Sequence, residues 1–347
     1  MATENTSLEQ LGQEFEQLQK KPRSPMGDAV REFKQNRVAV MSVIFILIIA
    51  VLAIFAPLFT PYGYNTQNTA YAREKPMTPY VITTDKYEQC HWKGTPLDFG
   101  CTVYILGADG LGRDLLSRSI FGARISLLVA IIGSSVSLII GTIYGVISGY
   151  FGGKIDDIMM RIVDFLWALP VLVIIIIMTV YFKALARAGA TGFKGQLIQW
   201  DQALGGLLFM FVAIGALSWL GMARQARGQI LSHKKKEYVE AALSIGAGSN
   251  RIIFKHLLPN IIGPLLVLES MAIPGYIGLE AFLSFIGLGV NPPIPSWGIM
   301  ISEGYLGIKS NPHLVLVPGT ALTLLTLAFN YMGDGIRDAI DPRIHGR

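Results

Sequence analysis

Charge is scarce in this sequence. Asp, Glu, Lys and Arg make up 15% of the 347 residues, whereas a soluble globular domain carries about 25%. The two cysteines are too few for a disulfide scaffold. Hydrophobic residues reach 52% and the mean hydropathy is +0.47, which excludes a soluble enzyme, a disordered chain and a coiled coil. Most of the apolar side chains are therefore expected to face lipid.

The sequence also lacks motifs that would supply energy or catalysis. A phosphate-binding loop needs Gly-x-x-x-x-Gly-Lys-[Ser/Thr], because backbone N–H groups and the lysine cradle the phosphates. The nearest match, Gly152-Gly153-Lys154, continues into Ile155. The five histidines are scattered, with no pair at metal-ligand spacing. We therefore expect no catalytic residue, no metal site and no cofactor on this chain. The energy for any work that it performs must then come from another protein.

Long apolar runs predict six membrane-spanning helices, since a bilayer core of about 30 Å needs about 20 apolar residues. The expected spans are Val38–Phe59, Ile125–Ser148, Phe165–Phe182, Ala203–Met222, Ile261–Ile286 and Leu314–Met332. The prediction is an all-α membrane protein with Pro170 and Pro274 kinking the third and fifth spans. Its expected parts are a segment 1–37, a span 38–59, a loop 60–124, a core domain 125–332 and a tail 333–347.

The distribution of basic residues predicts the orientation. With the N-terminus inside, the inner segments carry 18 Lys and Arg and the two short outer loops carry 4. The loop 60–124 is left out because long loops cross the membrane largely regardless of charge. Both termini are therefore expected in the cytoplasm. In a membrane protein such an excess marks inner loops, so the net charge of +5 does not indicate a nucleic-acid partner.

Cys90 and Cys101 both lie in the long outer loop. Disulfide bonds persist in the oxidising compartment outside the cytoplasmic membrane. We therefore predict that these two cysteines are joined, and two free thiols are the alternative.

The predicted cytoplasmic loop 224–260 has the most informative pattern. A helix-forming run, Glu237 to Gly246, is followed by further glycine, which permits the positive φ that ends a helix. A second helical run, Arg251 to Leu258, leads to Pro259 and the fifth span. A short helix–turn–helix that projects from a membrane has the shape of a segment that docks into a groove of a partner.

Specific residues in this loop resemble the EAA loop of ABC importer permeases. The residues that carry the resemblance are Glu240, Ala241, Ala242, Gly246, Leu258 and Pro259, with His256 in the form common among peptide permeases. Three further segments are similar to the dipeptide/oligopeptide/nickel permease family, in particular its second, C-type subunit. These segments are Gly107 to Arg118, Ser284 to Gly298, and Gly333 to Arg343.

The resemblance implies a type I ABC importer-like permease in the cytoplasmic membrane of a bacterium or archaeon. It implies four kinds of partner: membrane lipid, a homologous second permease, two cytoplasmic ATPases that hold ATP and Mg, and an extracytoplasmic binding protein. The EAA helix is then expected to seat in the ATPase and couple ATP hydrolysis to uptake of peptides or similar small solutes. The alternative is a self-contained secondary transporter or channel driven by an ion gradient, which has no need of the patterned loop.

Two acids lie inside the fifth predicted span. An acid there is costly and usually faces the bundle interior or a watery path. Glu269 is therefore a candidate for the translocation path, with a hydrogen bond to the partner permease as the alternative. Glu280 is interpreted as structural.

Polar residues also mark two expected helix starts. Asp156 and Asp157 are interpreted as a solvated helix start, because acids favour the positive end of the helix dipole. Arg113 and Asp114 are interpreted as a structural cap before the second span. Gating of the outer mouth and docking of the binding protein are the alternatives for this second pair.

Overall fold

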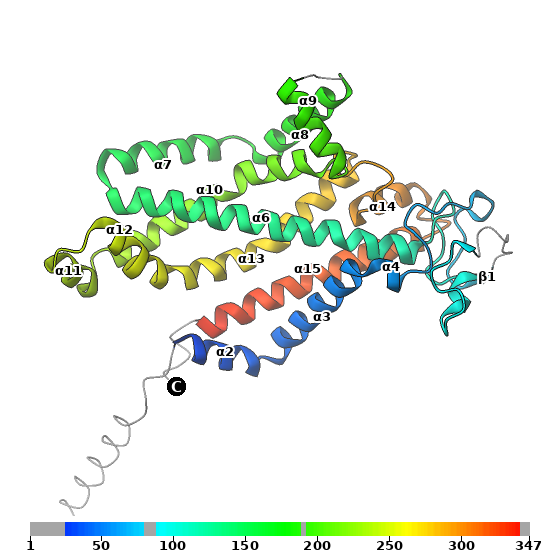
Figure 1. The fold of residues 1–347 in the computed structure, drawn as a ribbon, viewed down its shortest axis with the longest axis horizontal. Helices are drawn as coiled ribbons and strands as arrows, with labels where there is room; N and C mark the ends of the chain where they lie inside the picture. Colours follow the sequence, from blue (N-terminus) through cyan, green and yellow to red (C-terminus); the bar gives the residue numbers. More distant parts are fainter. Residues whose placement is uncertain (1–24, 80–87, 189–191, 341–347) are drawn as a thin grey trace, which may run out of the picture.

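The computed structural model describes residues 25–79, 88–188 and 192–340, and long helices dominate it (Figure 1). The described α-helices are α2 (Pro25–Gln35), α3 (Arg37–Ile54), α4 (Ala56–Phe59), α6 (Leu115–Phe151), α7 (Gly153–Ala168), α8 (Val171–Arg187), α9 (Gly192–Ala203), α10 (Leu207–His233), α11 (Glu237–Ser244), α12 (Ser249–Arg251), α13 (Leu258–Phe285), α14 (Trp297–Gly304) and α15 (His313–Ile340). A π-helical segment, η3 (Ile252–Leu257), joins α12 to α13. The short helices η1, η2 and η4 cover Thr69–Tyr71, Asp98–Cys101 and Tyr305–Gly307. Strands β1 (Thr78–Pro79) and β2 (Val103–Tyr104) pair antiparallel, with Thr78 opposite Tyr104.

Among the described residues, five continuous helical stretches are long and apolar enough to cross a membrane: α3, α6, α10, 249–285 and α15. The pair α7 and α8 passes the same test together but is bent by 81°. The chain therefore has six spans if this pair is one broken span.

The prediction of a single helix over Phe165–Phe182 is wrong. Helix α7 ends at Ala168, and Leu169 is extended, with φ −77° and ψ 142°. Pro170 then precedes α8. Proline disfavours helical conformation in the residue before it and has no N–H to donate, so the expected kink becomes a break. Pro274, by contrast, lies inside α13 without ending it.

Several helices extend beyond the apolar runs that predicted them. Helix α6 starts at Leu115 and not near Ile125, because the Asp114 carboxylate caps it and accepts the N–H of Ser117 at 2.7 Å. Helix α10 continues to His233, and α15 continues to Ile340. Hydropathy marks the stretch that suits lipid, whereas helical hydrogen bonding continues until a cap or a break stops it. The expected tail 333–347 is therefore helical as far as it is described.

Among the described elements, helices α6 and α10 share the most extensive contact. Gly141, Gly145 and Gly149 lie one turn apart on α6, where a Cβ would come within 2.5 Å of Met222, 2.3 Å of the Ala223 oxygen and 2.9 Å of Ile230 respectively. Small residues at such seams let backbones approach, which is how helices associate in lipid. Helix α15 packs against α3 and α13 on the other side of the bundle.

The two ends of the bundle differ (Figure 1). At one end, the hairpin of residues 237–257 projects; we call this the hairpin end. At the other lies the insert, residues 60–114, in which Tyr62, Trp92 and Tyr104 pack around a bond between Cys90 and Cys101. We call this the insert end. The start of α2 and the end of α15 both lie toward the hairpin end.

Candidate coupling site

Helix α11 packs on the bundle by one face. Val239 and Ala242 are buried, three residues apart, and Val239 packs in a cluster that includes Ile230 and Ile252. Glu240 and Ala241 face outward and are exposed. The EAA residues thus divide between two tasks, because Ala242 packs inside this chain while its two neighbours are available to a partner.

A polar contact fixes α11 to the end of α10. The Tyr238 hydroxyl lies 2.9 Å from Nδ1 of His233. The Lys236 ammonium donates to Nε2 of the same ring at 3.3 Å, so Nδ1 carries the proton and donates to the Tyr238 oxygen.

Gly246 ends α11 in the way the sequence predicts. Its φ is 81°, in the left-handed region. The Gly246 N–H donates to the Leu243 oxygen at 2.9 Å, and the Ala247 N–H donates to the Ala242 oxygen at 3.0 Å. These two bonds form the Schellman motif that closes many helices. A Cβ on Gly246 would meet open space within this chain, so the backbone angle alone constrains this position in the isolated subunit.

The second arm of the hairpin is continuous with the next span. The sequence predicts a helical run to Leu258 and a separate span from Ile261, but the stretch Ser249–Phe285 is one helix of 37 residues. Its η3 segment widens the helix just before Pro259, and the Leu258 N–H donates to the Ile253 oxygen. Since Pro259 has no N–H, the π turn lies where the regular helical bonding is interrupted. The hairpin is therefore joined to the fifth span by a continuous helix.

The tip of the hairpin exposes large apolar side chains. Leu243, Ile245 and Phe254 are 54%, 82% and 68% exposed. Glu240 and Lys255 are charged, exposed neighbours. An exposed apolar patch rimmed by charge is typical of a protein interaction site. We call these three apolar residues the tip patch.

An ion pair braces the base of the hairpin end. Arg227 on α10 holds the Asp156 carboxylate of α7 by two bonds of 2.6 Å, and the Ser148 hydroxyl also donates to Asp156. The interpretation of Asp156 as solvated is wrong, because it is buried against α10; Asp157 is exposed as expected. The partner Arg227 lies 71 residues away in the sequence, so the local pattern could not indicate it.

The two acids of α13 are both satisfied inside this chain. Buried Glu269 accepts a 2.8 Å hydrogen bond from Ser137 on α6 and a 2.9 Å bond from the Tyr276 hydroxyl. Its contact with a solute stays a prediction. Glu280 is fully buried and accepts a 2.6 Å bond from Ser284, which fits the structural interpretation.

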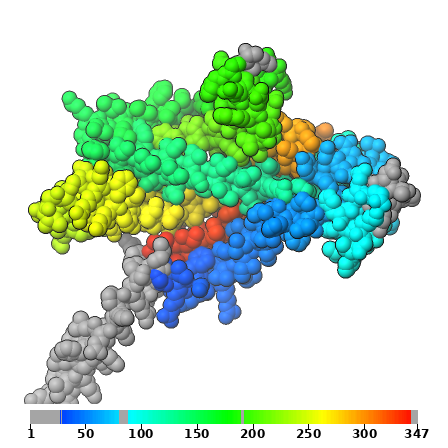
Figure 2. All heavy atoms as spheres, in the orientation of Figure 1, coloured from blue at the N-terminus to red at the C-terminus, as the bar shows by residue number. Residues whose placement is uncertain are grey.

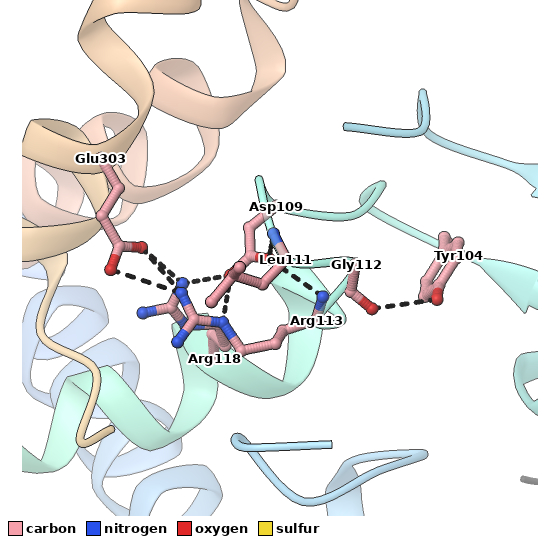
Figure 3. A network of polar contacts seen from close by, with 7 residues as sticks. All are labelled: Tyr104, Asp109, Leu111, Gly112, Arg113, Arg118 and Glu303. Atoms are coloured by element: carbon pink, nitrogen blue, oxygen red, sulfur yellow. Dashed lines mark hydrogen bonds and ion pairs between the residues drawn. The ribbon is translucent and has the colours of Figure 1, made fainter. Parts of the chain in front are cut away.

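The motif Gly107 to Arg118 folds into the polar network of Figure 3. The Asp109 carboxylate accepts a 2.5 Å hydrogen bond from Nε of Arg113 and also accepts one from Arg118. Glu303 of α14 forms ion pairs with both arginines, at 2.6 Å from Arg118 and 3.1 Å from Arg113. The Arg118 side chain is 1% exposed, whereas Glu303 is 41% exposed. Arg113 thus has a structural partner, as expected, and Glu303 is a member that no local sequence signal singles out.

These features define a class: a multi-span helical membrane protein with a helical hairpin projecting from one end. The described residues contain no group of His, Cys, Asp and Glu that could hold a metal ion.

Comparison with known proteins identifies the family. Residues 141–346 match the family described as "Binding-protein-dependent transport system inner membrane component", and residues 24–76 match the "N-terminal TM domain of oligopeptide transport permease C". The chain belongs to the family of binding-protein-dependent transport system inner membrane components.

Relatives align along nearly the whole chain. The chain is 39% identical to the oligopeptide transport system permease protein OppC of Haemophilus influenzae, over 97% of this chain and 94% of that protein. It is 36% identical to OppC of Bacillus subtilis, over 95% and 93%. It is also 36% identical to the dipeptide transport system permease protein DppC of Bacillus subtilis, over 91% and 85%. Among solved structures, the inward-facing MetNI methionine ABC transporter aligns with 65% of this chain and 96% of its own, with TM-score 0.46 and 16% identity.

Proposed function

We propose that this chain is a permease subunit of an ABC importer that takes up di- or oligopeptides, or similar small solutes, delivered by an extracytoplasmic binding protein. The observation that carries the proposal is near-complete alignment with relatives named as oligopeptide and dipeptide permeases. The chain is a translocation subunit and not an enzyme. A second, homologous permease completes the translocation path.

Power comes from two separate cytoplasmic ATPases, which hold ATP and Mg. The sequence has no phosphate-binding loop, and the tip patch offers exposed apolar area for docking. In this proposal the hairpin seats in a cleft of the ATPase, with Glu240 and Ala241 at the contact. Closure of the ATPase pair then moves the helix 249–285. Coupling of this kind is reciprocal, so solute loading in turn favours ATPase closure.

The hairpin end faces the cytoplasm in this proposal, together with both termini. The support is the excess of basic residues in the inner segments and the position of the described chain ends toward the same end as the hairpin. The insert end, with its disulfide, then lies outside, where such a bond persists. The membrane is the cytoplasmic membrane of a bacterium or archaeon.

A reconstitution experiment separates this function from a secondary transporter. Vesicles carry this chain with its partner permease and both ATPases, and radiolabelled dialanine, trialanine and a pentapeptide are offered with the binding protein. We expect uptake that needs both ATP and the binding protein. Uptake by the purified chain alone, driven by an ion gradient, would overturn the proposal.

A further inference from the structure

Helix α9 lies at the edge of the molecule on short connections. It follows α8, which ends at Arg187, and precedes α10, which begins at Leu207. Figures 1 and 2 show the α8–α9 region projecting from the rest of the bundle. Because both neighbouring helices belong to spans, the chain between them stays close to the boundary where those spans end.

One face of α9 is fixed to α10. Ile198 and Asp201 are buried. The Asp201 carboxylate accepts the N–H of Phe209 at 3.1 Å, and the Asp201 backbone oxygen accepts the N–H of Gly206 at 2.7 Å. Helix α9 is therefore held in one orientation relative to the span that follows it.

A second face is apolar and uncovered. Phe193, Trp200 and Leu204 are 72%, 59% and 51% exposed. With the half-buried Leu197 they repeat at the spacing of one helix face, since the Leu204 N–H continues the helical bonding to the Trp200 oxygen at 3.0 Å. We call Phe193, Trp200 and Leu204 the α9 stripe.

A third face is polar. Gln199 and Gln202 are exposed, and at 100° per residue they lie on the side of the helix away from the α9 stripe, whereas exposed Gln196 borders the stripe. A helix with aromatic and aliphatic residues on one face and polar residues on another is the pattern of helices that lie in the plane of a membrane interface. Tryptophan in particular gathers at that interface, where its ring is apolar and its N–H reaches water.

We propose that α9 is an interfacial membrane anchor whose stripe inserts at the headgroup–acyl boundary of the lipid bilayer. The occupant is lipid because α9 is confined to the boundary by its short connections, and because α8 beside it continues the apolar surface with exposed Ile177, Val180 and Tyr181. The anchor fixes the position of the bent span α7–α8. This inference depends on the membrane location of the spans and not on the solute or on which side α9 faces.

Spin labels on the two exposed faces test the anchor. Single cysteines are introduced as Phe193→Cys and Leu204→Cys in the stripe, with Gln199→Cys and Gln202→Cys as matched controls on the polar face. The full chain, purified with its partner subunits, is labelled without reductant and reconstituted into phosphatidylcholine–phosphatidylglycerol vesicles. The unsubstituted chain measures background labelling. Power-saturation EPR then measures how often each spin label collides with oxygen, which concentrates in lipid, and with a water-soluble nickel chelate.

The expected result is a several-fold higher ratio of oxygen to nickel collisions at the two stripe positions than at the two controls. Equal ratios at all four positions would place the stripe in water and overturn the proposal. Low collision rates with both reagents at the stripe would mean that a protein surface covers it, which also overturns the proposal.

A second measurement, tryptophan quenching, uses a substitution that leaves the stripe apolar. In Trp200→Phe, the share of tryptophan emission quenched by brominated lipid should fall relative to the unsubstituted chain, because an interfacial fluorophore has been removed. An unchanged share would show that Trp200 does not contact lipid.

Discussion

Arg118 of α6 forms an ion pair with Glu303 of α14, with 2.6 Å between Nη1 and Oε2. The two residues lie 185 positions apart, so the bond joins the start of the second span to the helix that follows the fifth. The Asp109 carboxylate contacts the same Nη1 of this buried guanidinium (Figure 3). The motif Gly107 to Arg118 therefore serves as a joint between distant parts of the insert end.

The members of this network should differ in their contribution to stability. Asp109→Asn removes one of the two negative charges that pair with buried Arg118. Breaking a buried ion pair lowers the free energy of unfolding by about 3–5 kcal/mol. Glu303→Gln should cost less, about 1 kcal/mol, because water screens its half-exposed carboxylate. Thermal unfolding of the purified subunit measures both. Glu88→Gln is the control, since its pair with Lys93 is exposed, and it should leave the melting temperature unchanged. Equal losses in all three variants would contradict this ranking.

Gly246→Asp should separate folding from coupling. Its Cβ meets nothing in this chain, so stability should change by only about 1 kcal/mol, the cost of a left-handed non-glycine residue. We expect insertion to persist while uptake is lost and ATP hydrolysis is no longer stimulated by the loaded binding protein. Gly287→Asp, at a glycine with φ 82° where a Cβ also enters open space, is the matched control. If Gly246→Asn restores most of the uptake, the glycine is only a helix stop. Normal uptake by Gly246→Asp would remove the hairpin from the coupling mechanism.

The tip patch should be needed for binding the ATPases and not for folding. Ile245→Glu and Phe254→Glu alter exposed side chains, and such surface changes usually shift stability by less than about 0.5 kcal/mol. Co-purification of the ATPases should nevertheless be lost. Leu306→Glu, an equally exposed apolar residue at η4, should leave co-purification intact. The docking proposal fails if all three variants retain the ATPases.

Glu269 should tolerate a neutral acceptor. Glu269→Gln keeps a side-chain oxygen for Ser137 or Tyr276 and should preserve both the fold and uptake. Glu269→Leu removes the acceptor of the Tyr276 hydroxyl and leaves Ser137 only its 3.3 Å bond to the Ser218 oxygen, at a cost of about 1–3 kcal/mol, and should lower the unfolding temperature. A folded Glu269→Gln variant that selectively loses uptake of peptides with a free N-terminus, and keeps uptake of acetylated ones, would instead assign the carboxylate to the translocation path.

The bond between Cys90 and Cys101 should stabilise the insert without taking part in transport. Closing a loop of this size is worth about 3 kcal/mol in the chain-entropy model. Replacing both cysteines with serine should make the insert more sensitive to protease, while uptake continues. Intact-mass analysis after alkylation checks the native state, since two alkylated thiols without reductant would contradict the bond.

Hydropathy alone predicted most of the spans, because a run such as Val38–Phe59 has few environments other than lipid available to it. It failed over Phe165–Phe182, where composition suits a span but the extended Leu169 before Pro170 breaks the helix. Helix stops were also predictable, since Gly246 acts through its own backbone angle. The ends of the long helices were not predictable from hydropathy, because a capping residue such as Asp114 lies outside the apolar run.

The candidate site was predictable only where its residues are neighbours in sequence. The hairpin of residues 237–257 forms from local propensity and a glycine turn. The pairing of Asp156 with Arg227, and of Arg118 with Glu303, depends on how separate helices pack. A single sequence contains no signal for such pairs, and each charged residue looks like a solvated one.

If the hairpin docks as proposed, the continuous helix from Ser249 to Phe285 is the lever that carries its movement to the membrane. At 1.5 Å per residue, its arm from the hairpin to Pro274 is about 38 Å, so a rotation of about 5° about that proline would carry the hairpin about 3 Å. The short arm beyond Pro274 would move less, and in the opposite direction. A small closure between two ATPases could thus tilt the insert end of this helix by a few degrees without any local unfolding, and Glu269, on the long arm between hairpin and pivot, would move with it.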